Sequence, residues 1–179
     1  MQLPAPSTAA FALLLHLAAA SRGAEEIKPP FKLTWGETTA RIERLLKGAK
    51  TTVAAKRMLE DGREAWDVEG IVQPGLKRTI FYFKQGELVE VELQYQREDW
   101  DQDKYDRYMG DMRRSIEAKH GPGQLIARKT EPVEEVMQTV VGYKWNQNNT
   151  ELDLFFYSAQ NPQDATQTFR TLSVHYKTL

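Results

Sequence analysis

The strongest constraint on the fold is the order in which two hydrophobic periods alternate along the chain. Two segments, 38–48 and 105–120, carry apolar side chains at helix spacing. Each leads into four segments in which apolar and polar residues alternate, which is the period of a half-buried β-strand. This order predicts an α+β protein with antiparallel strands, in which each helix covers one face of a sheet.

The first helix is predicted from its cap and its stripe. Thr38 is placed to cap the amino-terminal end, Ile42 and Leu46 fall on one face, and Gly48 stands where a left-handed helix end is favoured. Four strand candidates follow it, at 50–59, 64–72, 78–84 and 88–96.

The second helix has the clearest stripe in the chain, and Gly121-Pro122-Gly123 ends it. Its apolar residues are Tyr105, Tyr108, Met109, Met112 and Ile116. The next four strand candidates are 124–130, 136–145, 151–158 and 168–177, and the polar stretch 159–166 is expected to be a loop.

Because the same order of elements occurs twice, we expect two helix-plus-antiparallel four-stranded-sheet halves packed together, residues 21–97 and 98–179. Sequence identity between the two is negligible, so the repetition is one of order and period alone. Coincidence within an antiparallel α+β protein is the alternative explanation.

The first twenty residues are expected to be a signal peptide. Residues 1–20 contain no charged side chain, and Phe11–Ala20 is an apolar run of the length of a signal-peptide core, about half of a bilayer crossing. Cleavage after Ala20 would leave no transmembrane span. A buried amino-terminal helix or a disordered tail is the alternative. Because the chain has no Cys, neither a disulfide nor a bacterial lipid anchor is available, which favours a periplasmic or secreted location.

The charge balance bears on the class of partner. The chain has 24 Lys plus Arg and 25 Asp plus Glu, a formal net charge of −1. A phosphate-binding domain normally has a basic excess, so we expect no nucleic-acid partner.

The stretch 31–46, with Trp35-Gly36 before a capped short helix, resembles the opening of exported bacterial domains with the β-lactamase-inhibitor-protein-like fold. The helix end Lys119-His120-Gly121-Pro122 and the closing strand 172–176 extend the resemblance. It implies an exported protein that acts by surface contact, as the family's secreted enzyme inhibitors and small outer-membrane assembly lipoproteins do. The chain lacks the cysteines of both groups, and no partner-binding residue can be carried over by position.

Catalytic chemistry finds little support in the sequence. His120 and His175 lie far apart, and no nucleophile motif or phosphate-binding loop is present, so we expect no enzyme activity, no cofactor and no metal. A carboxylate-based hydrolase is a further hypothesis. Its available carboxylates are Glu90 with Glu92, which are expected to face water, or Asp99, Asp101 and Asp103. The acids at 99–103 alternate as in a calcium loop but lack its glycine and its final glutamate.

Aromatic side chains are the remaining candidates for recognition. Either Phe81 with Phe83 or Phe155 with Tyr157 could point away from the helices and form an exposed platform, or the other half of the protein could cover that face. We therefore predict a non-enzymatic exported module that binds an unidentified protein or cell-envelope component through a sheet face. The alternative is a domain that stacks the same aromatics on a small molecule or glycan.

Overall fold

The computed structural model describes residues 25–179, so the predicted signal peptide lies outside the described residues. The helices are α1 (Thr39–Gly48) and α2 (Gln102–His120). The strands are β1 (Thr52–Met58), β2 (Glu64–Glu69), β3 (Leu76–Lys84), β4 (Glu87–Tyr95), β5 (Gln124–Val133), β6 (Val136–Gln147), β7 (Thr150–Asn161) and β8 (Asp164–Thr178). Along the chain the order is therefore one helix and four strands, twice.

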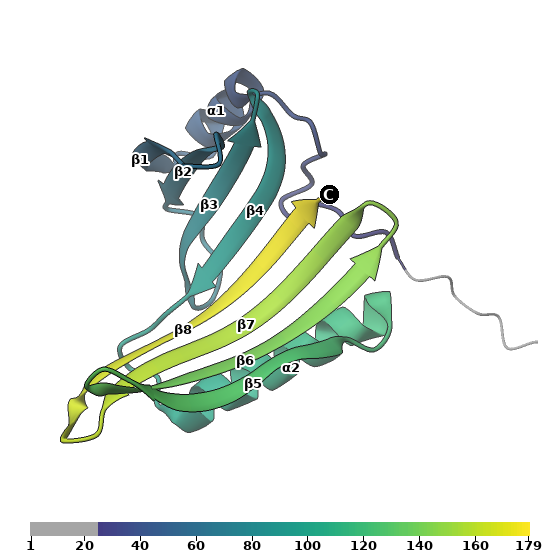
Figure 1. Cartoon of the computed structure of the whole chain (residues 1–179). Helices are drawn as coiled ribbons and strands as arrows, with labels where there is room; N and C mark the ends of the chain where they lie inside the picture. Colours follow the sequence, from purple (N-terminus) through teal and green to yellow (C-terminus); the bar gives the residue numbers. More distant parts are fainter. Residues whose placement is uncertain (1–24) are drawn as a thin grey trace, which may run out of the picture.

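The division into two halves is wrong. All eight strands form a single antiparallel sheet in the order β1-β2-β3-β4-β8-β7-β6-β5 (Figure 1). The junction is a regular ladder between β4 and β8, which runs from Glu90 opposite Lys177 to Tyr95 opposite Leu172. Since this pairing satisfies the backbone groups that two separate sheets would leave at their edges, the strands continue as one sheet.

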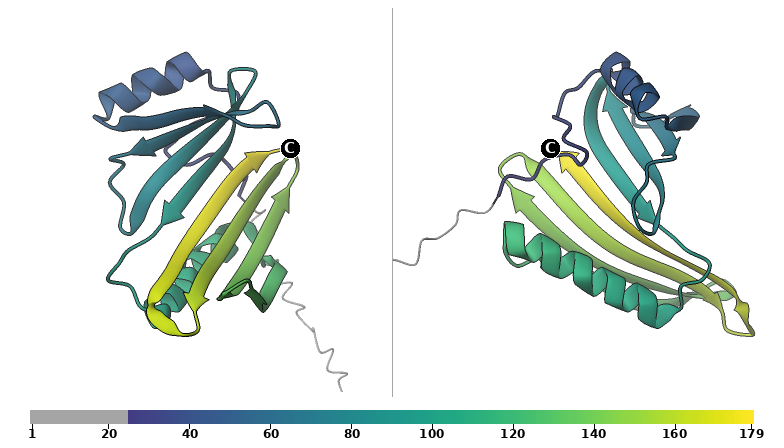
Figure 2. Two further views of the ribbon diagram at one scale, coloured as in Figure 1. Left: turned by 60° about the vertical axis from the view of Figure 1, so that its left-hand side comes forward. Right: turned by 180° about the vertical axis from the view of Figure 1, so that it is seen from behind.

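Both helices lie on the same face of this sheet, which we call the helix face, and the opposite face is called the open face (Figure 2). Ile42 and Leu46 of α1 and Tyr105 and Met109 of α2 are buried. They belong to one core cluster with the inward side chains of β2, β3, β4, β6, β7 and β8. The core is therefore continuous across the junction between β4 and β8.

The ends of the helices follow from local chemistry. The Thr38 side chain accepts a hydrogen bond from the Arg41 amide, as predicted, and Asp101 caps α2 by accepting from the Lys104 amide. Gly121 ends α2 with φ 81°. The prediction for Gly48 is wrong, because this residue is still helical and the left-handed conformation falls on Lys50, with φ 57°.

The loop predicted over 159–166 is wrong as well. Strands β7 and β8 stay paired almost to their turn, from Thr150 opposite Thr178 to Asn161 opposite Asp164. Polar residues suit this hairpin because its tip extends beyond the core, and the ladder satisfies their backbone groups. The hairpin is visible as the yellow-green extension in Figure 1.

The segment before α1 lies between the two helices on the helix face. The Glu25 amide donates to the Lys119 carbonyl at 2.9 Å, and the Ile27 amide donates to Gln147 Oε1 at 2.9 Å. Ile27 is buried and joins the core. No helix in residues 25–179 is long and apolar enough to cross a membrane.

Candidate functional site

The four predicted contact residues divide between the two faces of the sheet. Phe81 and Phe83 are each 1% exposed and lie in the core of the helix face. The Phe83 ring packs against Trp66 with centroids 4.8 Å apart. These two residues therefore cannot form an exposed platform for a protein partner, because α1 and the amino-terminal segment lie over this part of the sheet.

Phe155 and Tyr157 lie on the open face and are half-buried. The Phe155 ring rests on Gly142 of β6, where a Cβ would come within 2.4 Å of the ring, so only glycine allows this close approach. Tyr157 pairs with Phe169, whose ring centroid is 6.0 Å away. Ile126 on β5 flanks Phe155. We call these four residues, Ile126, Phe155, Tyr157 and Phe169, the aromatic row.

The aromatic row exposes a substantial apolar surface. Phe169 is 46% exposed and Ile126 is 40% exposed. Neither residue was singled out from the sequence. Phe169 lies within the predicted strand 168–177, and its alternation with Thr171 and Ser173 is the signal that could have placed it beside Tyr157.

Beside the aromatic row, paired charges cross the open face from β1 to β6, and we call them the ionic band. Its principal pairs are Arg57 with Asp67, Arg63 with Glu90, His175 with Glu90, Lys177 with Asp153, and Lys144 with Glu151. Arg78 and Gln94 extend the band from Asp67 to Glu92. Five cations, Arg57, Arg63, Arg78, Lys144 and Lys177, lie in the band with five carboxylates, Asp67, Glu90, Glu92, Glu151 and Asp153.

Glu90 and Glu92 form the centre of the band, and the expectation that they face water is wrong. They are 7% and 6% exposed. Arg63 Nη1 donates to Glu90 Oε2 at 2.6 Å, and His175 Nδ1 lies 2.9 Å from Glu90 Oε1. Tyr82 Oη donates to Glu92 Oε2 at 2.6 Å. A sequence pattern could have revealed this cluster. Glu90 and Glu92 are two residues apart on one strand, and His175 and Lys177 have the same spacing on the strand that pairs with it.

These contacts shift the ionisation of the groups involved. Burial of the Glu90 carboxyl opposes its charged form, but the hydrogen bonds from His175 and Arg63 outweigh burial, so its pKa lies below the ordinary value of 4.5. Burial, together with the hydrogen bond to Glu92, raises the pKa of Tyr82. The Tyr82 hydroxyl therefore keeps its proton and donates it to Glu92.

Acid is expected to weaken the fold partly through Glu90. A carboxyl with a lowered pKa in the folded state contributes stability above the unfolded value of 4.5 and loses it as the pH falls through the folded value. The difference in unfolding free energy between wild type and Glu90→Gln should therefore shrink between pH about 7 and about 3. Urea denaturation across this range measures it. The control is Glu26→Gln, which removes a carboxylate that is 63% exposed. If the difference in unfolding free energy between wild type and Glu90→Gln does not change with pH, the lowered pKa of Glu90 is contradicted.

The polar groups at the centre of the open face are hydrogen-bonded to one another. The carboxylates at its centre each contact a cation or a neutral donor, and His175 Nε2 lies 3.2 Å from Ser173 Oγ. Within residues 25–179, no group of three or more His, Asp and Glu side chains is arranged to hold a metal ion. Of the acids at 99–103, Asp99 pairs with Arg97 and Asp101 caps α2.

Comparisons of the chain with protein-family models, with curated proteins and with solved structures gave no significant match. The resemblance carried by residues 31–46 therefore stays a prediction.

Proposed function

We propose that the protein is an exported, non-enzymatic interaction module that binds another protein of the cell envelope through the open face of β5 to β8. The observation that carries the proposal is the aromatic row, an apolar patch on the face that neither helix covers. Export is supported by the apolar run Phe11–Ala20 and by the absence of Cys.

A protein partner suits the layout of this face. Interfaces combine a centre rich in aromatic side chains with a polar rim, and a few large side chains supply most of the binding free energy. The aromatic row provides such a centre, in which Phe155 is held in place by Gly142 and by the edge of the His175 ring, 6.1 Å away between centroids. Rings positioned in advance lose little conformational freedom on binding.

The ionic band suits the role of a rim. Because its charges are already paired, the band would distinguish between partners by their shape and hydrogen-bond pattern, and not by attracting partners of one net charge. The same pairing speaks against Glu90 as a general acid, since its pKa lies below the ordinary value whereas a general acid near neutral pH needs a raised one.

Retention of partners by immobilised protein tests the proposal. Tyr157→Ser with Phe169→Ser should reduce the amount of a specific envelope protein retained by at least about tenfold, because hot-spot side chains each contribute about 2 kcal/mol or more. The matched control is Met58→Ser with Leu125→Ser, which removes two exposed apolar side chains elsewhere on the sheet, 71% and 45% exposed.

Two outcomes would overturn the proposal. Equal retention by both double variants would show that the aromatic row is not the contact surface. Retention of polysaccharide and no protein, lost on the same substitutions, would favour the glycan-binding alternative.

A further inference from the structure

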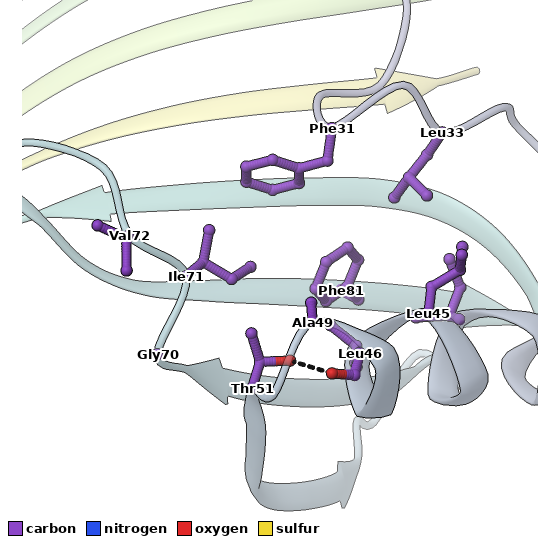
Figure 3. Close-up of a pocket in the computed structure, with 11 residues that line it drawn as sticks. Phe31, Leu33, Leu45, Leu46, Ala49, Thr51, Gly70, Ile71, Val72 and Phe81 are labelled. Atoms are coloured by element: carbon purple, nitrogen blue, oxygen red, sulfur yellow. Dashed lines mark hydrogen bonds between the residues drawn. The ribbon is translucent and has the colours of Figure 1, made fainter.

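A cavity of about 460 Å³ lies on the helix face between α1 and the loop that joins β2 to β3 (Figure 3). Phe81 of β3 forms its floor and Leu45 of α1 one wall. Ile71 and Val72 of the loop form another wall, and Phe31 of the amino-terminal segment faces them from the opposite side. The volume is within the usual range for small-molecule sites, and the cavity is separate from the open face.

The lining offers a ligand almost no hydrogen bonds. The one side-chain hydroxyl in the wall belongs to Thr51, and it already donates to the Leu46 carbonyl at 3.0 Å. A polar ligand would therefore lose its bonds to water without replacement, whereas an alkyl chain loses none.

The walls of the cavity also leave apolar surface uncovered. Phe31 is 40% exposed, Leu45 is 43% exposed and Val72 is 99% exposed. Phe31 and Lys32 moreover hold left-handed backbone conformations, with φ 63° and 59°, which cost energy for residues other than glycine. Covering these side chains with an alkyl chain would remove their contact with water.

The charged residues that border the cavity are mainly basic. Lys32, Lys47 and Lys50 are exposed, and each is next in sequence to a residue that lines the cavity. None of the three forms an ion pair with a residue in the part of the chain that the structure describes. Of the nearby acids, Glu43 is paired with Lys56, and Glu69, opposite Thr52 in the β1–β2 ladder, lies on the same side of the cavity as Lys50.

We propose that this cavity binds a single-chain fatty acid. The alkyl chain lies between Phe31, Phe81 and the β2–β3 loop, and the carboxylate lies at Lys32, Lys47 and Lys50. The apolar lining favours the alkyl chain of the fatty acid, and the three unpaired ammonium groups favour its carboxylate. This site is independent of the aromatic row, so either proposal can fail alone.

Calorimetric titration of the full chain with octanoate, decanoate and dodecanoate, each below its micellar concentration, tests the proposal. We expect saturable binding of one equivalent that tightens about fourfold for each added methylene until the cavity is filled. A dodecyl trimethylammonium ion should bind at least about tenfold more weakly than dodecanoate. Absence of saturable binding, or equal binding of the cationic amphiphile, would overturn the proposal.

Two sets of variants locate the site. Ala49→Trp adds a ring to the wall of the cavity at an exposed position and should abolish binding. Lys32→Glu, Lys47→Glu and Lys50→Glu together should weaken dodecanoate binding by at least about tenfold. The matched control reverses three exposed lysines elsewhere, Lys77, Lys84 and Lys104, with the same change in net charge, and should bind nearly as the wild type does.

Photocrosslinking of the unmodified chain by a diazirine-labelled dodecanoate keeps the test independent of variant folding. Labelled residues within 45–51 and 70–72 are the expected result. Labelling confined to the open face or to α2 would refute the assignment of the cavity.

Discussion

Replacing Lys177 by Met is expected to lower the free energy of unfolding by about 3–5 kcal/mol, the usual cost of leaving one partner of a buried ion pair alone. Lys177 Nζ donates to Asp153 Oδ2 at 2.7 Å and to Glu151 Oε1 at 3.2 Å. Asp153 is only 2% exposed, and its other cation, Lys144 Nζ, lies 3.8 Å from Oδ1, too far for a hydrogen bond. Burial already raises the pKa of Asp153, and Lys177 is the main group that opposes this shift.

Urea denaturation followed by tryptophan fluorescence measures the change. Lys28→Met is the matched control, since Lys28 pairs with Glu26 at 3.4 Å while both side chains are more than 60% exposed. Exposed pairs of this kind contribute about 0–1 kcal/mol. If the two variants lose similar amounts, the ionic band is a solvated surface and the burial of Asp153 is not maintained in solution.

A double variant separates the contribution of the ion pair to stability from that of the packing of the lysine's methylene groups. In Lys177→Met with Asp153→Leu, both charges of the buried pair are gone, and Lys144 stays paired with Glu151 at 2.6 Å. Since a buried ion pair replaced by apolar residues is often neutral in stability, most of the loss should be recovered. A double variant as unstable as the single one would assign the loss to packing instead.

Local periodicity was enough to predict most helices and strands but not their assembly. The stripe of Tyr105, Met109 and Ile116 predicted α2 because helix spacing is a property of neighbouring residues. The pairing of β4 with β8 joins residues more than seventy positions apart, and no local pattern states which strand edges meet. Only the complementarity of Glu90 and Glu92 with His175 and Lys177 marks that junction in the sequence.

The candidate site was predicted in part for a similar reason. Side chains of a strand point alternately to its two faces, so residues two apart share a face. This predicted that Phe155 lies on the same face as Tyr157, and Phe81 on the same face as Phe83. Which pair faces the helices depends on how the sheet is covered, a tertiary property that strand spacing does not contain. Tyr82, which lies between the two buried phenylalanines and bonds to Glu92, shows that the polar member of that run is the one on the open face.

The expected effect of truncating Tyr105 is as large as that of removing Lys177. Tyr105 is 1% exposed, and its ring contacts Trp100 and Phe156, with centroids 5.3 Å and 5.9 Å away. Its hydroxyl accepts from the Arg97 amide and donates to the Arg170 carbonyl, both at 3.2 Å. This one side chain therefore fastens α2 to β7 and β8 and to the connection after β4.

Tyr105→Ala should cost about 3–5 kcal/mol, because it opens a cavity and removes the ring contacts. Tyr105→Phe keeps the ring and leaves the Arg97 amide and Arg170 carbonyl without their partner, for an expected loss of roughly 1–3 kcal/mol. Arg107→Ala, at an exposed position on the same helix, should change stability by no more than about 0.5 kcal/mol. Urea denaturation of the three variants gives the order directly. A loss for Tyr105→Ala no larger than that for Arg107→Ala would mean that α2 does not pack on β7 and β8, and the division into a helix face and an open face would then be wrong.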